Sequence, residues 1–310
     1  MATGGPAPDD ATTSVAVALA EARRRGLDRL DAQVLLGQVM QRERTWLLAH
    51  GEALLDHAQS TAWQAWFGRR AAGEPLAYLV GSKEFHGLDL QVDRRVLIPR
   101  PETEGLVDWA LELATPRSAP RDGEHGKHGE HGETRPLRVV DLGTGSGAIA
   151  IALAVAARER GLAIDVHAGD VSDEALAVAR ANAARHAVAV EFRAGSWWAP
   201  WAGMRFDIAV SNPPYVADGD PHLPALRHEP LGALLAGADG LADLRQIVAE
   251  APHHLDPGGW LLLEHGWDQA ERVRDLLRTA GLGAVQTRSD LAGQPRCTGA
   301  RTPRQAAALT

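Results

Sequence analysis

Residues 137–154 read LRVVDLGTGSGAIAIALA, which is an apolar run, a glycine-rich turn and a second apolar run. The first run has the length and composition of a buried strand, and the second has those of a helix that ends at Gly161. Between them, Gly143, Gly145 and Gly147 let the backbone approach a ligand without Cβ clashes, and the start of the helix offers free N–H groups. The stretch therefore predicts a strand–turn–helix unit with a ligand-binding turn.

The strand–helix alternation continues towards the end of the chain. We predict helices at 147–161, 172–186, 241–255 and 267–281, with Ser172 as an N-cap. Such alternation builds a parallel sheet covered by helices, an α/β fold in which ligands bind beyond the carboxyl ends of the strands. The predicted strands are 137–143, 163–170, 189–194, 206–211, 260–266 and a closing pair that starts at 284.

Two cofactor classes fit the glycine turn. Gly143, Gly145 and Ala148 match the dinucleotide pattern, whereas Gly143, Gly145 and Gly147 match the tighter pattern of S-adenosylmethionine (SAM) enzymes. In both cases Asp170, at the end of the second strand, can accept hydrogen bonds from a ribose diol. The spacing does not choose between them, but Asp141 favours SAM, because a carboxylate repels a pyrophosphate and attracts a sulfonium and an ammonium group.

A second polar motif, SNPPY at 211–215, ends the strand FDIAV at 206–210. In the predicted topology this strand lies next to the strand at 137–143, so Asn212 faces the cofactor turn. The Asn212 side chain and the Pro213 carbonyl offer two acceptors, and two successive prolines hold them rigidly. Tyr215 adds a flat face and a hydroxyl, so that the set can hold a planar NH2 group.

Holding a planar NH2 group suits methyl transfer to a weakly nucleophilic nitrogen. Because the lone pair of an amide or aromatic amine is delocalised, both N–H bonds have to be fixed to aim the nitrogen at the methyl group of SAM. Orientation of this kind can contribute about 7–11 kcal/mol at best. The motif alone can be a structural strand end, but beside DLGTGSG at 141–147 we interpret it as a catalytic and substrate-binding site.

The rest of the chain predicts two further parts and one insert. Residues 1–73 have helical amphipathic patterns, with Leu35, Leu36, Val39, Trp63, Trp66 and Phe67 as the expected core, and residues 74–100 predict a β-hairpin connector around HGLD. Residues 101–310 form the α/β domain. They contain a flexible segment, 116–136, rich in Gly and His. We interpret any metal binding by its His125, His128 and His131 as adventitious and predict no metal site.

The composition narrows the class of protein. The 310-residue chain has a net charge of −8, which argues against a general nucleic-acid binder, and no apolar run of membrane-spanning length. Its start lacks a secretory signal pattern, and Cys297 is its only cysteine, so no internal disulfide forms. We expect a cytoplasmic protein, active as a monomer, that requires neither nucleic acid nor a membrane.

Several longer stretches resemble one family. The motifs NPPY at 212–215 and DLGTGSG at 141–147 are similar to those of amino-methyltransferases that act on adenine, cytosine or glutamine amides. The stretch at 74–104, together with RHEPLGALLAGADGL and GGWLLLEHGWDQ, resembles the HemK/PrmC family of release factor glutamine methyltransferases.

This resemblance implies a Rossmann-like methyltransferase domain that methylates the glutamine in the Gly-Gly-Gln loop of peptide chain release factors. It implies that the helical domain and the hairpin dock the release factor. Asn212 has roles towards both cofactor and substrate, and Asn212, Pro213 and Tyr215 are the expected catalytic residues. By the family's pattern, SAM is bound by Gly143, Thr144, Gly145, Ser146, Gly147, Asp170, Trp197 and Asn212, and the glutamine is bound by Asn212, Pro213, Pro214 and Tyr215.

The chain departs from the family's pattern at a few positions. Ser196 stands where an acidic residue often precedes the tryptophan, His86 stands at a common aromatic position, and Ser146 replaces a frequent threonine. An acid at 196 would accept from the adenine amino group, and the sequence leaves open how Ser196 changes the recognition of adenine.

Three other functions compete with this one. A ribosomal-protein glutamine methyltransferase shares NPPY, but RPETE at 100–104 resembles the release factor enzymes. A DNA adenine methyltransferase has to flip a base and neutralise phosphates, which the acidic charge opposes. A non-catalytic SAM-binding module would not need an intact NPPY.

Overall fold

The computed structural model of the chain describes residues 13–118 and 135–304. These residues form two compact units, Met1–Gly81 and Ser82–Thr310, and the division falls inside the segment 74–100 that we predicted as a connector. Most of the predicted insert at 116–136, including His125, His128 and His131, lies outside the described residues.

The first unit consists of helices, and side chains cap the starts of α1, α2 and α4. The carboxylate of Asp28 accepts from the backbone N–H of Leu30 at 2.7 Å, and Asp56 forms a reciprocal capping box with Gln59. Of the expected core, Leu35, Leu36, Trp63 and Phe67 are buried, and Val39 and Trp66 pack against them partly buried. The helices are α1 (Val15–Arg24), α2 (Arg29–Met40), α3 (Arg44–Ala49), α4 (His57–Ala71) and α5 (Leu76–Val80).

The second unit is built on a seven-stranded sheet in the order β5-β4-β3-β6-β7-β9-β8. The pairs β3–β4, β3–β6, β4–β5 and β6–β7 are parallel, and β9 runs antiparallel to both of its neighbours. This confirms the predicted α/β fold, including the strand ending in SNPPY beside the strand that precedes the glycine turn. The strands are β3 (Leu137–Leu142), β4 (Ile164–Asp170), β5 (Glu191–Ala194), β6 (Phe206–Ser211), β7 (Leu255–Glu264), β8 (Gly283–Ser289) and β9 (Pro295–Arg301).

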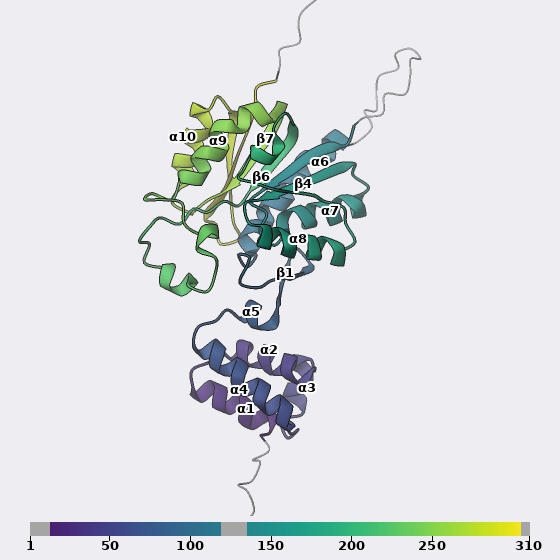
Figure 1. The fold of residues 1–310 in the computed structure, drawn as a ribbon, viewed down its shortest axis with the longest axis vertical. Coiled ribbons are helices and arrows are strands. Elements are labelled where there is room, and N and C mark those ends of the chain that lie inside the picture. The colour runs from purple at the N-terminus through teal and green to yellow at the C-terminus, as the bar shows by residue number, and fades with distance from the viewer. Residues whose placement is uncertain (1–12, 119–134, 305–310) are drawn as a thin grey trace, which may run out of the picture. The chain divides into compact units, whose positions relative to one another are not determined.

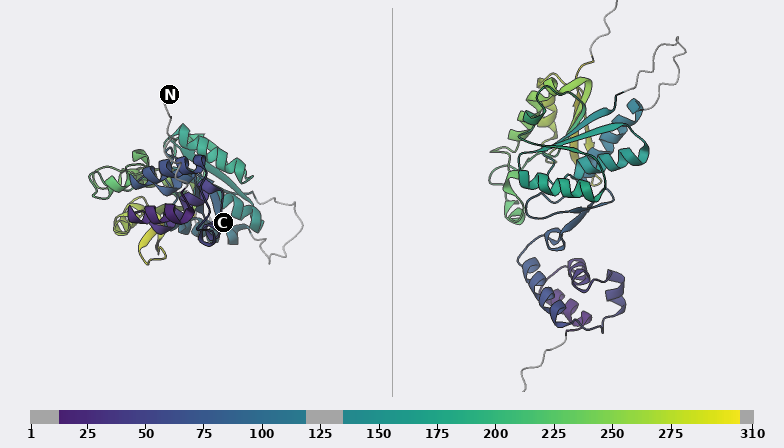
Figure 2. Two further views of the ribbon diagram at one scale, coloured as in Figure 1. Left: turned by 90° about the horizontal axis from the view of Figure 1, so that it is seen from below. Right: turned by 45° about the vertical axis from the view of Figure 1, so that its right-hand side comes forward.

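Helices cover both faces of this sheet, as Figure 1 and Figure 2 show. Since side chains alternate along a strand, neighbouring residues such as Val139 and Val140 enter two different cores. One core lies under α6, α7 and α8, and the other lies under α9 and α10. The helices are α6 (Glu104–Ser118), α7 (Ala148–Arg160), α8 (Asp173–Arg185), α9 (Ala242–His254) and α10 (Ala270–Thr279), with the short turns η1 (Pro101–Thr103), η2 (Ala199–Trp201), η3 (Leu223–Leu226) and η4 (Leu231–Ala233).

One strand begins earlier than its sequence predicts. Pro257–Gly259 was expected to be a turn before a strand at 260–266, but β7 already pairs with β6 at Leu255. A register shift between Phe206 and Ile208 accommodates the extra residues.

The predicted hairpin forms as β1 (Ser82–Phe85) and β2 (Leu88–Gln91), but the first part of the predicted connector, Leu76–Val80, is the helix α5 instead of a strand. Its two-residue turn, His86–Gly87, has positive φ at both positions, which matches the twist of the flanking strands. The buried Asn182 of α8 fastens β2, because its amide exchanges hydrogen bonds with the backbone of Gln91 and donates to the carbonyl of Ser146 in the glycine turn. The hairpin is thus tied to the turn that precedes α7.

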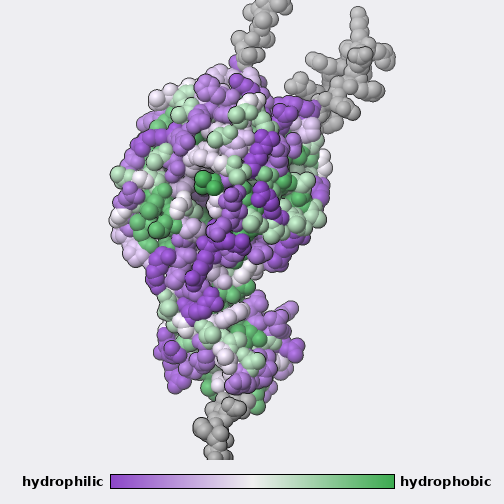
Figure 3. Space-filling model, in the orientation of Figure 1, coloured by the Kyte–Doolittle hydropathy of each residue, from purple (hydrophilic) through white to green (hydrophobic). Residues whose placement is uncertain are grey.

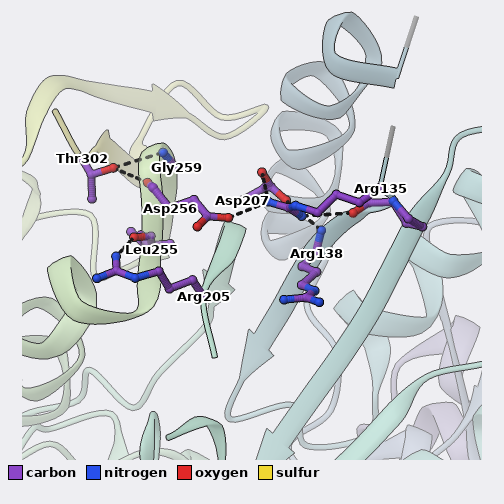
Figure 4. A network of polar contacts seen from close by, with 9 residues as sticks. Arg135, Arg138, Arg205, Asp207, Leu255, Asp256, Gly259 and Thr302 are labelled. Atoms are coloured by element: carbon purple, nitrogen blue, oxygen red, sulfur yellow. Dashed lines mark hydrogen bonds and ion pairs between the residues drawn. The ribbon is translucent and has the colours of Figure 1, made fainter. Parts of the chain in front are cut away.

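An ionic network joins the starts of three strands at the edge of the sheet opposite the glycine turn (Figure 4). The carboxylate of Asp207 accepts from the Arg135 guanidinium at 2.7 Å and from the backbone N–H of Arg138 at 2.9 Å, and Arg135 also contacts Asp256 at 2.6 Å. Beside it, Thr302 donates to the Asp256 carbonyl at 2.6 Å and accepts from the Gly259 N–H.

Replacing Asp207 with alanine is expected to destabilise the second unit without affecting ligand binding. The Arg138 N–H loses its acceptor, which costs about 1–3 kcal/mol and lowers the thermal midpoint by about 2–12 °C. Calorimetry with and without SAM measures both effects. An unchanged midpoint, or a loss of affinity for SAM, would contradict this role.

The described helices include none that is both long and apolar enough to span a membrane. On the face drawn in Figure 3, hydrophilic and hydrophobic side chains are interspersed over the described surface. The colouring of that face therefore does not point to one apolar interaction site, and the candidate site comes from the strand ends.

Candidate functional site

A cavity of about 300 Å³ lies where the carboxyl ends of β3, β4 and β6 meet. Parallel strands leave their carboxyl ends and the following loops at one edge of the sheet, where α/β proteins bind ligands. All of its lining residues belong to the second unit. They are Arg95, Val96, Leu97, Gly143, Gly145, Asp170, Val171, Ser172, Ala175, Gly195, Ser196, Trp197, Asn212, Pro214, Pro230, Gly232, Ala233 and Asp243.

The glycine turn gives the cavity its floor. The backbone N–H groups of Gly143 and Thr144 both donate to the Gly169 carbonyl at 2.9 Å, which folds the turn over the end of β4. A Cβ on Gly143 would lie 3.0 Å from the ring of Trp197, so the close approach of this ring requires glycine there. At Gly145 an added Cβ would meet no atom within 4 Å, which leaves an open cradle for a ligand.

Asp170 closes the turn from the side of β4. Its carboxylate accepts from the backbone N–H of Gly145 at 2.8 Å and from that of Ser172 at 2.9 Å. Burial raises the pKa of Asp170, and these N–H groups partly offset the effect. A carboxylate has about four acceptor positions, so further positions are left for hydroxyl groups of a ligand.

Asp141 lies fully buried beneath the turn. Its Oδ2 accepts from the Thr144 hydroxyl at 2.6 Å. Burial raises the pKa of Asp141 to about 7, although Thr144 and the N–H of Ala150 counteract it. Asp141 therefore shapes the turn and carries a negative charge mainly above neutral pH.

This raised pKa predicts a pH dependence of stability. The folded protein keeps a proton on Asp141 that the unfolded chain releases near pH 4, so the stabilisation is complete below that pH and is lost as the pH rises through about 7. Between pH 5 and 8 the thermal midpoint of the ligand-free protein should fall by about 5–11 °C more than that of Asp141→Asn. If calorimetry shows that the thermal midpoints of both proteins change equally with pH, the pKa of Asp141 is not raised.

The NPPY motif directly follows β6. The Ser211 hydroxyl donates to the Leu142 carbonyl at 2.6 Å, which ties the ends of β6 and β3 together. The next side chain, that of Asn212, donates through Nδ2 to the Thr103 hydroxyl at 3.1 Å. The Asn212 amide group is therefore engaged through its nitrogen, and Asn212 itself lines the cavity.

The backbone of Tyr215, the last residue of the motif, is held in a fixed position. Its backbone carbonyl accepts from the Gln269 side chain at 3.0 Å, and a Cβ on Gly240 would come within 2.4 Å of the same carbonyl oxygen. Gly240 has a φ of +69°, so both the conformation and the space require glycine. Burial raises the pKa of the Tyr215 hydroxyl, which stays protonated and can donate a hydrogen bond.

The predicted site residues divide into two groups. The structure brings together Gly143, Gly145, Asp170, Trp197, Asn212 and Pro214 as cavity wall. Thr144, Ser146, Gly147, Pro213 and Tyr215 lie beside it without lining it. Thr144 and Ser146 hold the turn through Asp141 and Asn182, and Gly147 is the N-cap residue of α7.

Several cavity residues were not among the predicted site residues. Asp243 lies in the wall near Trp197, whose indole acts on it as a hydrogen-bond donor, and the exposed Ser196 lies there too. Glu229 binds the Ile98 N–H at 3.1 Å and forms an ion pair with Arg100. It thereby joins the loops at 95–97 and 230–233, both of which line the cavity. Glu229 and both loops lie in the stretches that resemble the release factor glutamine methyltransferase family. This resemblance was the only sequence signal for their role.

SAM fits this donor set. The open glycine cradle suits a methionine moiety, and the carboxylate at the end of β4 suits a ribose diol. The indole ring in the cavity wall suits an adenine. Among the described residues, no group of three or more His, Cys, Asp or Glu is arranged to hold a metal.

Comparisons with known proteins identify relatives of this chain. The family model described as "PrmC N-terminal domain" matches residues 10–81, and that described as "Methyltransferase small domain" matches residues 131–228. A "Release factor glutamine methyltransferase" of Xylella fastidiosa strain Temecula1 is 47% identical over 93% of this chain and 98% of its own length. A protein of the same description from Bordetella pertussis is 47% identical over 88% of this chain and 95% of its own length. Among solved structures, the hMettl16 catalytic domain in complex with MAT2A 3'UTR hairpin 6 has a TM-score of 0.51 at 16% identity, over 79% of this chain and 84% of that one, and this likeness shows the Rossmann-like fold.

Proposed function

The chain belongs to the family of release factor glutamine methyltransferases and is an enzyme, and from this premise we propose its reaction. It transfers a methyl group from SAM to the side-chain amide nitrogen of the glutamine in the Gly-Gly-Gln loop of peptide chain release factors. As translation takes place in the cytoplasm, the reaction belongs there.

One observation carries the proposal: Asn212 lines the same cavity as Gly143, Gly145 and Asp170, with its nitrogen engaged by Thr103. We infer from this that Asn212 Oδ1 faces the cofactor-like cradle as an acceptor. A planar amide nitrogen needs such an acceptor beside the methyl donor.

The cofactor residues follow from the wall of the cavity. Asp170 accepts from the ribose hydroxyls, Trp197 packs against the adenine, and the turn at Gly143–Gly147 receives the methionine moiety. When bound, SAM supplies a methyl group that its sulfonium activates.

The substrate residues orient one nitrogen. Asn212 Oδ1 and the Pro213 carbonyl accept the two protons of the glutamine NH2, and Tyr215 packs against the amide plane. The rigid Pro213–Pro214 backbone keeps these acceptors in place, so that little ordering is left for the moment of reaction. Both acceptors favour the positive charge that develops on the nitrogen, which loses a proton after methylation.

We assign docking of the release factor to the helical unit and the hairpin. The match of residues 10–81 to the N-terminal family model supports this assignment. Because docking on a protein surface needs no phosphate contacts, the net charge of −8 is compatible with it.

Methyl transfer from radiolabelled SAM tests the proposal. We expect label on a bacterial release factor, and none on its Gln-to-Ala loop variant, on ribosomal proteins or on DNA. Label on ribosomal protein would favour the related ribosomal-protein enzyme, and label on the loop variant or on DNA would refute the glutamine assignment.

A further inference from the structure

We propose that a second cavity of the α/β unit is a docking cleft for arginine or lysine side chains that flank the target glutamine. The inference rests on the function proposed above and adds a property of its substrate, a basic segment beside the methylated loop. The cleft has a volume of about 430 Å³ and shares no lining residue with the cofactor cavity. Its walls are η1 with the start of α6 on one side and the turn between β8 and β9 on the other.

The cleft lies directly beside the NPPY motif. Because β7 and β8 both run antiparallel to β9, the turn after β8 lies at the same edge of the sheet as the carboxyl end of β7. On the other wall, Thr103 accepts from Asn212 at 3.1 Å and stands between the cleft residues Glu102 and Glu104. Since consecutive Cα atoms are about 3.8 Å apart, residues that flank a glutamine bound at Asn212 can reach the cleft.

The cleft has an excess of negative charge. Five carboxylates and two guanidinium groups line it, and both guanidinium groups are already paired. Arg288 contacts Glu112 at 2.6 Å, and Arg296 contacts Asp290 at 3.3 Å. The carboxylates left without a guanidinium partner are those of Glu102, Glu104 and Asp108.

These three carboxylates are available to a cationic side chain. Glu102 is exposed and has no hydrogen-bond or ion-pair partner among the described residues. The turn of the β1–β2 hairpin adjoins the other two, because the His86 N–H donates to Glu104 at 3.0 Å and the His86 ring lies 3.1 Å from Asp108. The cleft therefore continues the hairpin, to which we assign docking, and its carboxylates suit the planar fork of an arginine.

A buried carboxylate beneath the cleft is an independent sign of a missing cation. Glu264 is 1% exposed, and its Oε2 has no hydrogen-bond partner in the part of the chain that the structure describes. Glu264 pairs directly with Cys297, so both side chains leave the sheet on the same face, and Cys297 lines the cleft. An unpartnered buried carboxylate costs free energy, and a cation that enters the cleft reduces this cost.

The proposed substrate matches this charge. A release factor acts on the ribosome, whose RNA attracts cationic protein surfaces, so a basic segment beside its loop is expected. The same carboxylates repel nucleic acid as an occupant, and no described group of three or more His, Cys, Asp or Glu is arranged to hold a metal. Leu291, which is fully exposed in the β8–β9 turn, adds an apolar contact at the rim of the cleft.

Charge reversal in the full-length protein tests the cleft, with an intact release factor as the substrate. Glu102→Lys places a cation in the cleft. Glu159→Lys is the matched control, because Glu159 is an exposed carboxylate in the last turn of α7, which starts at the glycine turn and ends at the opposite edge of the sheet. Burial raises the pKa of Glu264 to about 7, so assays at pH 8 keep this group ionised. The readouts are KM, kcat, the Kd for the release factor and the thermal midpoint.

We expect Glu102→Lys to raise KM and Kd for the release factor roughly tenfold at low salt, with a smaller effect on kcat. Glu159→Lys should change neither constant by more than about twofold. Glu264→Gln should raise KM about threefold without lowering the thermal midpoint, since it keeps the shape of the side chain and removes an unpartnered buried charge.

Two peptides test the chemical class of the occupant in the presence of S-adenosylhomocysteine, the demethylated cofactor. One carries Gly-Gly-Gln flanked by arginines, and the other carries citrulline, an uncharged analogue, at the same places. The arginine peptide should bind about tenfold more tightly to the unmodified enzyme and without preference to Glu102→Lys. Equal binding of both peptides to the unmodified enzyme, or equal KM values of Glu102→Lys and Glu159→Lys, would overturn the proposal. Failure of the proposed function is a different result, because the unmodified enzyme would then leave the glutamine of the release factor unlabelled.

Discussion

Replacing Asn212 with alanine is expected to lower kcat for glutamine methylation by about 10²- to 10³-fold. The variant loses the side-chain acceptor that aims the substrate nitrogen, while the Pro213 carbonyl remains. The Kd for SAM should change by less than about threefold, since Asp170, Trp197 and the glycine turn are untouched.

Single-turnover methylation and calorimetric titration with SAM separate these two effects. The thermal midpoint checks that the variant is folded, and Thr302→Val controls for loss of a side-chain hydrogen bond of a buried residue far from the cavity. Turnover equal to that of the unmodified enzyme, or a parallel collapse of cofactor binding, would show that Asn212 does not orient the substrate.

Replacing Asp170 with asparagine is expected to have the largest effect on cofactor binding. The carboxylate accepts from Gly145 and Ser172 in the ligand-free protein and is the only group we assign to the ribose diol. An amide nitrogen at one of these positions would face a donor, so at least two charge-assisted hydrogen bonds are lost. We therefore expect a loss of about 3 kcal/mol of binding free energy, which raises the Kd for SAM about 10²-fold.

Asp173→Asn is the matched control for this variant. Asp173 is an exposed carboxylate in the first turn of α8, three residues further along the chain, and its neutralisation should leave the Kd within about twofold. Titration of both variants with S-adenosylhomocysteine, the demethylated cofactor, checks the ribose contact without turnover. Equal affinities for Asp170→Asn and Asp173→Asn would remove Asp170 from the site.

The local parts of the fold were predictable from the sequence. The helix after the glycine turn was expected at 147–161 and is α7 (Ala148–Arg160), and Ser172 caps α8 with a 3.1 Å bond to the Ala175 N–H. The neighbourhood of β3 and β6 followed from the topology of parallel sheets and is confirmed. These features depend on contacts within a few residues or on the general rules of α/β folds.

Contacts between distant segments were not predictable from the same patterns. Asn212 meets Thr103 across 109 positions, and Arg100 meets Glu229 across 129. The sequence marked RPETE at 100–104 only as a feature of resemblance, whereas the fold gives its Thr103 a physical contact with the NPPY motif. A glycine-rich pattern likewise does not tell which of its residues face a ligand, since Gly145 lines the cavity and Ser146 does not.

A crystal structure with S-adenosylhomocysteine and a peptide carrying Gly-Gly-Gln tests the central claim most directly. The substrate amide nitrogen should lie about 2.7–3.2 Å from both Asn212 Oδ1 and the Pro213 carbonyl oxygen, with its lone pair towards the cofactor sulfur. A complex in which Asn212 turns Nδ2 to the substrate, or in which the amide oxygen occupies that place, would contradict the proposed mechanism.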